Sequence, residues 1–171
     1  LALWEPDPEQ AYVLLQEAKQ LGSESLEAVR QSVSDMRVDP LQGKLLEDAI
    51  AKLVTEFRSI TGILPECDIK LSRPLSQTTS ATLFRVVQEG LTNICKHANA
   101  STVSIRICTE SDYLSLVLKD DGQGFSMNNN SPGFGLQGMQ ERMMNLGGSV
   151  ELISQPGMGC QVIAHLRYQK I

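Results

Sequence analysis

Hydrophobic residues recur at helical spacing in three long segments of the chain. Residues 8–36 carry them at intervals of three and four, which predicts a helix. Pro40 ends this pattern, because the residue before a proline avoids the helical backbone. Residues 44–60 and 79–97 predict two further helices. The first helix must bury its hydrophobic stripe on its own domain or in a helical bundle with a second copy, and the sequence leaves both open.

Alternation of hydrophobic and polar residues predicts strands elsewhere. We expect them near residues 67–71, 103–107, 114–118, 150–153 and 161–167. Residues 120–138 are rich in Gly, Asn, Ser and Pro and predict a loop, followed by a short helix over residues 137–146. Strands that form one mixed sheet, with helices on one face, make an α+β two-layer sandwich. A long N-terminal helix precedes this sandwich.

Composition and charge narrow the classes of partner. The 171 residues, 42% hydrophobic and 20% charged, suffice for one compact domain and an appended element. A net charge of -5 argues against a nucleic acid or an anionic membrane as partner. No hydrophobic run reaches the roughly 20 residues of a membrane span. The chain starts at Leu1, so we expect a fragment of a longer protein, whose membrane anchoring the sequence leaves open.

The cysteines argue against a metal or redox site. Cys67, Cys95, Cys108 and Cys160 are widely spaced and form no C-x-x-C pair. We interpret them as small buried side chains in a reducing, cytoplasmic compartment.

One side of the third predicted helix gathers polar side chains. Glu89, Asn93, Lys96 and His97 fall there at 100° per residue. An amide oxygen at Asn93 suits Mg²⁺, which takes few protein ligands, while Lys96 can neutralise phosphate and Glu89 can orient a water molecule or accept a proton. A solvated helix face would explain the same residues.

Two glycine motifs follow. Asp120, Gly122 and Gly124 form D-x-G-x-G after a strand. There, backbone can approach a flat ligand closely and a carboxylate can accept from an exocyclic amine. An ordinary Asp/Gly turn is the alternative.

The second glycine motif, G-x-G-L-x-G-M, contains Gly133, Gly135 and Gly138 and opens a helix. Free backbone N–H groups at such a position suit phosphates, although the lysine of a P-loop is missing.

Together and in this order, the three motifs resemble the N box and the two glycine boxes of the ATP-binding domain of sensor histidine kinases. This domain belongs to the superfamily shared with gyrase, heat-shock chaperones and mismatch-repair ATPases. The tract GFGLQGMQERMMNLGGSVEL, with PGMGCQVIAHL after it, resembles the subfamily with short dimerisation helices, which signals to helix-turn-helix response regulators. The resemblance covers residues 8–168.

The resemblance implies roles for individual residues. Asp120 would bind the adenine amino group, Gly122 and Gly124 would shape the adenine pocket, and Asn93 would ligate Mg²⁺ with Glu89 as its catalytic neighbour. Residues 125–132 would form the mobile part of a lid over the triphosphate. The remaining nucleotide contacts would come from Lys96, His97, Phe125, Gly133, Gly135, Leu136, Gly138 and Cys160.

The resemblance also implies an activity. The domain would bind ATP and Mg²⁺ and donate the γ-phosphoryl group to a histidine, for relay to an aspartate of a cognate response regulator. Residues 1–38 would be the second helix of a dimerisation domain, homodimeric in the parent protein, and residues 39–171 the catalytic domain. The helix with the phosphate-accepting histidine is missing, and neither His97 nor His165 is assigned that role, so we expect no autophosphorylation.

One departure and two alternatives stand beside this interpretation. Cys160 occupies a position where the family often has Thr, and a thiol is a weaker hydrogen-bonding group, so adenine affinity is expected to be modest. A serine kinase that inhibits a sigma factor has the same ATP-binding fold. A non-catalytic dimerisation module is the other alternative.

Overall fold

A computed structural model describes residues 10–16, 18, 19, 22, 29, 40–110, 112–126 and 134–167. The chain divides into two compact units, residues 1–38 and residues 39–171. In the first unit every described residue is helical. The rest of the helix expected over residues 8–36 lies outside the described residues.

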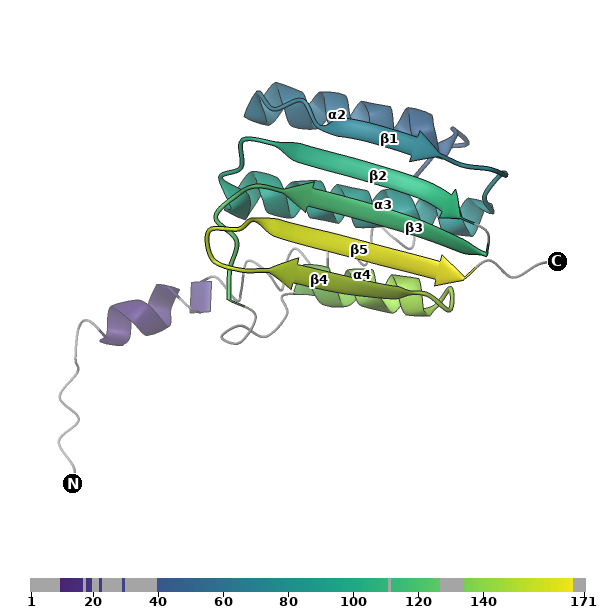
Figure 1. Cartoon of the computed structure of the whole chain (residues 1–171). Coiled ribbons are helices and arrows are strands. Elements are labelled where there is room, and N and C mark those ends of the chain that lie inside the picture. The colour runs from purple at the N-terminus through teal and green to yellow at the C-terminus, as the bar shows by residue number, and fades with distance from the viewer. Residues whose placement is uncertain are drawn as a thin grey trace. The chain divides into compact units, whose positions relative to one another are not determined.

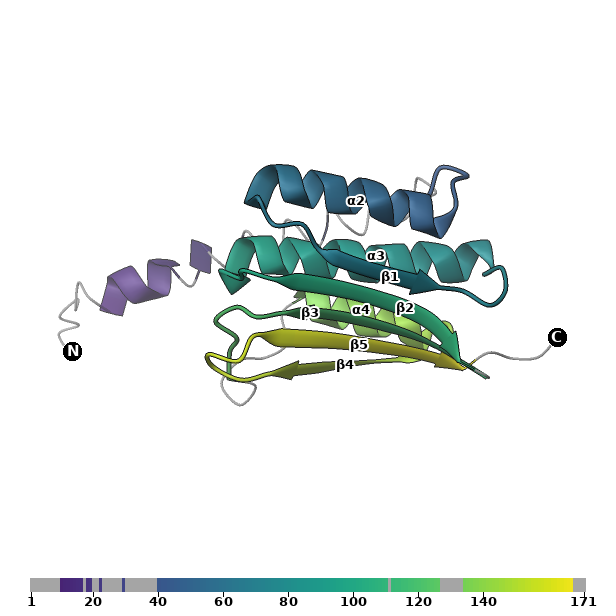
Figure 2. The same ribbon diagram turned by 45° about the horizontal axis from the view of Figure 1, so that its top comes forward.

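The second unit is a mixed five-stranded sheet with helices on one face (Figure 1). Its elements are α2 (Leu46–Thr61), β1 (Glu66–Lys70), α3 (Gln77–Asn93), the π turn η1 (Ile94–Ala98), β2 (Val103–Glu110), β3 (Tyr113–Asp120), α4 (Phe134–Met144), β4 (Ser149–Ser154) and β5 (Cys160–Arg167). The strand order is β1-β2-β3-β5-β4; β1 runs parallel to β2, and all other pairs are antiparallel. Helices α2, α3 and α4 cover the same face (Figure 2). The predicted α+β two-layer sandwich is confirmed.

The core lies between the sheet and the helices. Alternate residues of the strands point into it, as the predicted period of two requires. The hydrophobic ones below 5% exposure on β2 and β3 are Val103, Ile105, Ile107, Leu114, Leu116 and Leu118. The helices add buried residues at intervals of three and four, such as Val87 and Leu91 of α3. The hydrophobic residues that recur at helical spacing and those that alternate along the strands therefore pack into one core.

Helix α4 begins earlier than the sequence predicted. It starts at Phe134, so Gly135 and Gly138 lie inside the helix and not in the loop expected up to residue 138. Each glycine in a helix interior costs about 1 kcal/mol relative to alanine. Burial of Met139 and Met143, both at most 1% exposed and one turn apart, offsets this cost.

Helix α3 ends differently from the prediction. Its α-helical part stops at Asn93, and residues 94–98 form a π turn that ends at Asn99 with φ 50°. A π turn is wider than an α turn, so side chains after Asn93 leave the spacing of 100° per residue. Cys95, interpreted from the sequence as buried, is exposed as a result, and the same interpretation is wrong for Cys67 of β1, which is also exposed.

Candidate functional site

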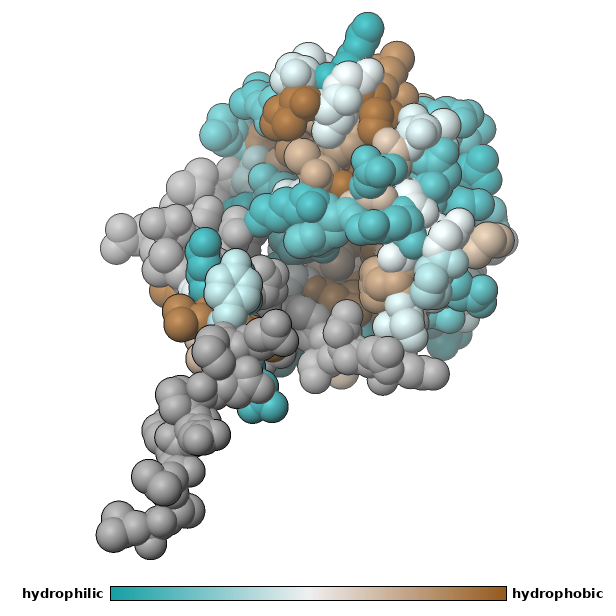
Figure 3. All heavy atoms as spheres, turned by 90° about the vertical axis from the view of Figure 1, so that its left-hand side faces the viewer, coloured by the Kyte–Doolittle hydropathy of each residue, from teal (hydrophilic) through white to brown (hydrophobic). Residues whose placement is uncertain are grey.

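The predicted site residues of the sheet lie at one of its ends. Strands β3 and β4 end there and β5 begins there (Figure 1). The ladder pairs Cys160 with Asp120 on one side and with Ser154 on the other. Figure 3 faces this end of the molecule, where hydrophilic and hydrophobic side chains are interspersed. Residues far apart in sequence are thereby assembled at one place.

Asp120 is a buried carboxylate, with 4% of the residue exposed. Its Oδ1 accepts a hydrogen bond from the N–H of Gly122 at 2.9 Å. Burial raises the pKa of Asp120, and the negative charge of Asp121 adds to this, while backbone N–H groups of Gly122 and Cys160 oppose it. Such a carboxylate, held at the edge of an apolar interior, suits a ligand that brings its own hydrogen-bond donor.

The adjacent Asp121 points elsewhere and has a structural role. Its Oδ1 accepts from the backbone N–H groups of Ser101 at 2.7 Å and Thr102 at 2.8 Å. These hydrogen bonds lower the pKa of Asp121. The two neighbouring carboxylates therefore differ in environment, and Asp121 fastens the segment after η1 to the end of β3.

The loop after β3 is attached to the end of the α3–η1 helix. The last carbonyl groups of a helix lack intrahelical partners. Here the backbone N–H of Gln123 donates to the carbonyl of Ala98 at 2.7 Å, and its side-chain Nε2 donates to that of His97 at 2.6 Å. Gly122 packs directly on Ala98, where a Cβ would overlap with the carbonyl oxygen. The D-x-G-x-G motif and the polar helix motif are thus joined through the backbone.

The turn before β5 closes this end of the site. The N–H of Gly157 donates to the carbonyl of Gln123 at 2.6 Å. Cys160 follows in the sheet, where burial, and then the nearby charge of Asp120, raise the pKa of its thiol to about 11. The thiol is therefore protonated near neutral pH.

The polar side of α3 meets α4. Glu89 and Asn93 are half-buried, whereas Lys96 and His97 on the π turn are exposed. A Cβ on Gly135 would overlap with Oε1 of Glu89. The helix motif and the second glycine motif are therefore in direct contact.

The other predicted residues take several positions. Leu136 is half-buried and packs against the core, and a Cβ on Gly138 would lie 3.1 Å from Nη2 of Arg142. Phe125 is 38% exposed. Gly133 and most of the expected lid, residues 127–133, lie outside the described residues.

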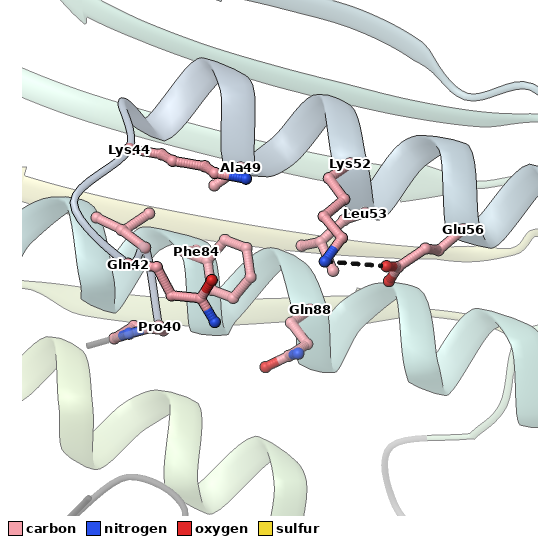
Figure 4. Close-up of a pocket in the computed structure, with 10 residues that line it drawn as sticks. Pro40, Gln42, Lys44, Ala49, Lys52, Leu53, Glu56, Phe84 and Gln88 are labelled. Carbon is pink, nitrogen blue, oxygen red and sulfur yellow. Dashed lines mark ion pairs between the residues drawn. The ribbon is translucent and has the colours of Figure 1, made fainter. Parts of the chain in front are cut away.

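A separate cavity of about 140 Å³ lies between α2 and α3 (Figure 4). Leu53 and Phe84 form part of its apolar lining, and the exposed ion pair Lys52–Glu56, 3.6 Å long, crosses its rim. None of the predicted site residues lines it.

Three positions that hold the site together escaped the sequence analysis: Asp121, Gln123 and Ser154. The first two occupy the variable positions around the D-x-G-x-G glycines. Ser154 had a signal, because it continues the inward-facing series Val150 and Leu152 of β4 as a polar residue. A hydroxyl at a core-facing position needs a hydrogen-bond partner.

Two features are absent from the described residues. Within these ranges, no three His, Cys, Asp or Glu side chains cluster as a metal site. None of the helices described here combines the length and the hydrophobicity needed to cross a membrane.

Comparison with known proteins identifies the family. Residues 78–170 match the family of histidine kinase-, DNA gyrase B- and HSP90-like ATPases. The signal transduction histidine-protein kinase/phosphatase UhpB of Salmonella typhimurium is 38% identical over 152 residues, which are 88% of this chain and 30% of the relative. The sensor histidine kinase LiaS of Bacillus subtilis is 34% identical over 143 residues, 83% of this chain and 39% of LiaS. The chain thus spans about a third of the length of these relatives.

A solved structure shares the fold. The histidine kinase AdeS of Acinetobacter baumannii has a TM-score of 0.63 with 18% identity, over 99% of this chain and 89% of that one. The family match covers the glycine motifs, the site residues and the whole sheet after β1. The chain therefore belongs to the histidine kinase-, DNA gyrase B- and HSP90-like ATPases, and its second unit is an ATP-binding domain of the kind found in sensor histidine kinases.

Proposed function

We propose that this chain is the catalytic part of a two-component sensor histidine kinase. It binds ATP with Mg²⁺ and donates the γ-phosphoryl group to a histidine on a helix outside this chain, for relay to an aspartate of a response regulator. The observation that carries the proposal is the buried carboxylate of Asp120, at the sheet end where the two glycine motifs and the polar side of α3 are linked.

The adenine end of the proposed site is formed by β3 and β5. The Asp120 carboxylate accepts a hydrogen bond from the exocyclic amine of adenine. Once the base is bound, no water molecule competes for this hydrogen bond. Gly122 and Gly124 shape this end of the site, because their missing Cβ atoms let the loop pack directly on the backbone of Ala98 and Gln155. Cys160, paired with Asp120 across the ladder, contributes a weak hydrogen-bonding group.

The phosphate end is formed by α3, η1 and α4. Asn93 offers an amide oxygen to Mg²⁺, which fits an ion that takes most of its ligands from phosphate and water. Bound there, Mg²⁺ supplies charge neutralisation at the β- and γ-phosphates. Lys96 and His97 are exposed on the π turn, within reach of solvent and of a negatively charged ligand. Gly135 and Gly138 lie in the first turns of α4, whose start offers backbone N–H groups to phosphate.

Glu89 is the proposed catalytic side chain. It lies between α3 and the start of α4, one turn before Asn93. There it can orient the accepting imidazole or a water on the metal. Most of the catalysis is positioning and charge neutralisation, as in other phosphoryl transfers.

The wider context is proposed from the relatives, whose names describe sensor kinases. Residues 1–38 belong to a dimerisation domain, the parent protein is a homodimer, and a cognate response regulator receives the phosphoryl group. The domain works in the cytoplasm without touching membrane or nucleic acid, in agreement with the net charge of -5.

Calorimetry with ATP tests the binding step. We expect Asp120→Asn to remove binding with and without Mg²⁺, and Asn93→Ala to remove only the part that depends on Mg²⁺. Asp68→Asn, on the edge strand β1 and in a surface pair with Lys70, is the matched control and should bind like the wild type. A wild-type chain that binds no ATP under either condition contradicts the proposal.

Label from γ-labelled ATP tests the transfer step. We expect an acid-labile phosphohistidine on a supplied histidine-bearing dimerisation domain, and none on this chain alone. Labelling of a serine on an antagonist protein would indicate the serine kinase class. Incorporation of phosphohistidine into this chain alone would contradict the assignment of His97 and His165.

A further inference from the structure

Ser154 is a buried hydroxyl at the last position of β4, with 7% of the residue exposed. Its Oγ accepts the backbone N–H of Phe125 at 3.0 Å and donates to the carbonyl of Gly159 at 2.9 Å. One side chain therefore uses both its acceptor and its donor to join two segments, 29 and 5 residues away along the chain.

Both segments belong to the walls of the nucleotide site. Phe125 ends the loop of the D-x-G-x-G motif, and Gly159 ends the turn before Cys160. Gly159, at φ 72°, packs so closely on Asp120 that a Cβ would overlap with the carbonyl oxygen of Asp120. A shift of Gly159 would thus be transmitted directly to the strand end that carries the Asp120 carboxylate.

The two segments also touch each other without side chains between them. A Cβ on Gly124 would overlap with the carbonyl oxygen of Gln155, and Gly157 donates to Gln123. Ser154 adds a side-chain bond on the buried side of this backbone contact. Loss of its hydroxyl would leave the Phe125 N–H and the Gly159 carbonyl without a partner, unless the segments move apart to admit water.

We propose that Ser154 is a positioning residue for nucleotide recognition. Its hydroxyl sets the distance between Phe125, at the end of the D-x-G-x-G loop, and the turn that supports Asp120. It acts through Phe125 and Gly159, and so fixes the position of the groups that bind the base. This inference rests on the proposed nucleotide-binding function.

Binding of ATP and of GTP by calorimetry, in the presence of Mg²⁺, tests the proposal on Ser154→Ala. We expect ATP affinity to fall by about tenfold or more, the effect of losing a buried hydrogen-bonding group. The ratio of ATP to GTP affinity should fall as well, because the carboxylate that distinguishes the two bases moves. Ser154→Thr, which keeps the hydroxyl and suits a strand, should restore both values. If the alanine variant does not fold, Ser154→Cys replaces it, since a thiol weakens both bonds at similar size.

Ser115→Ala is the matched control. Ser115 lies on the solvent-facing side of β3, where its Oγ contacts Sγ of Cys108 at 3.1 Å, and its loss should leave both affinities unchanged. Amide exchange of Phe125 should quicken in Ser154→Ala and stay slow in Ser115→Ala.

Two results would overturn the proposal. One is wild-type ATP affinity and base preference in Ser154→Ala, whatever the exchange rate of the Phe125 amide. The other is an equal loss of ATP and GTP affinity, which indicates only a smaller folded fraction. A wild-type chain that binds neither nucleotide would instead refute the proposed function, and the Phe125 exchange would still decide whether the hydroxyl holds the two segments together.

Discussion

The carboxylate of Glu89 on α3 lies against the backbone of Gly135 on α4, so closely that a Cβ at residue 135 would overlap with Oε1. The contact joins the helix that carries the proposed metal ligand to the helix that follows the proposed lid. Nothing larger than hydrogen fits between them unless Glu89 moves. The position of the proposed catalytic carboxylate is therefore coupled to the backbone of the second glycine motif.

This contact predicts the effect of Gly135→Ala. The new methyl group displaces the end of a flexible side chain, so the free energy of unfolding should change by about 1 kcal/mol or less. Phosphotransfer to a supplied histidine-bearing domain should fall by about tenfold or more, because Glu89 leaves its place. Transfer rates with labelled ATP and a denaturation curve measure the two effects. If the Gly135→Ala variant transferred the phosphoryl group at the wild-type rate, the position of Glu89 would be unimportant for transfer.

Gly122→Ala should be more damaging to the fold. Its Cβ would overlap with the carbonyl of Ala98, which is backbone and cannot rotate away. We expect a loss of about 1–3 kcal/mol in the free energy of unfolding and a fall of at least tenfold, roughly, in ATP affinity as the helix end separates from the loop.

Gly147→Ala is the control for backbone conformation alone. Gly147 has φ 74° with nothing near its hypothetical Cβ, and lies after α4, away from the site. It should lose about 1–2 kcal/mol from the left-handed conformation and keep its ATP affinity. Equal losses of ATP affinity in both variants would refute the role of the Gly122–Ala98 contact.

Asp120→Asn should raise stability while it removes function. Burial raises the pKa of Asp120 above its ordinary value of 3.8, so its contribution to stability is present below that value and is lost as pH rises through the raised pKa. Near neutral pH the unliganded variant should therefore unfold at a higher temperature than the wild type, and Asn can still accept from Gly122. The difference should shrink as the pH is lowered toward 3.8. A variant less stable than the wild type at neutral pH would contradict this account of Asp120.

Cys160 should resist alkylation. Its raised pKa, about 11, keeps the thiol protonated near neutral pH. Iodoacetamide should modify the exposed Cys95 about tenfold faster or more, as mass spectrometry of the peptides would measure. Equal rates would mean that Cys160 is neither buried nor influenced by Asp120.

Cys160→Thr should strengthen nucleotide binding. A hydroxyl is a better hydrogen-bonding group than a thiol, so ATP affinity should rise by about two- to tenfold. Cys108→Thr, on the solvent-facing side of β2, is the control and should leave the affinity unchanged. A fall in ATP affinity for Cys160→Thr would show that the added methyl group does not fit.

Local patterns in the sequence determined much of the fold. The alternation of Val103, Ile105 and Ile107 predicted a strand with one buried side, and β2 has that side in the core. The motif residues Asp120 and Gly122 were also identified from their spacing in D-x-G-x-G, and the hydrogen bond between them joins residues only two apart in sequence. Properties that depend on neighbours along the chain were accessible in this way.

Only the tertiary structure decided how distant parts of the site meet. The position of β5 between β3 and β4 places Cys160 between Asp120 and Ser154. Helix α4 starts at Phe134, where Gly135 packs on Glu89 and Leu136 packs against the core. The π turn at residues 94–98 presents the carbonyls of His97 and Ala98 to Gln123. All three features, namely the strand order, the start of a glycine-rich helix and the turn at a helix end, depend on contacts between residues far apart in sequence. The local spacing of residues carries no information about the energies of such contacts.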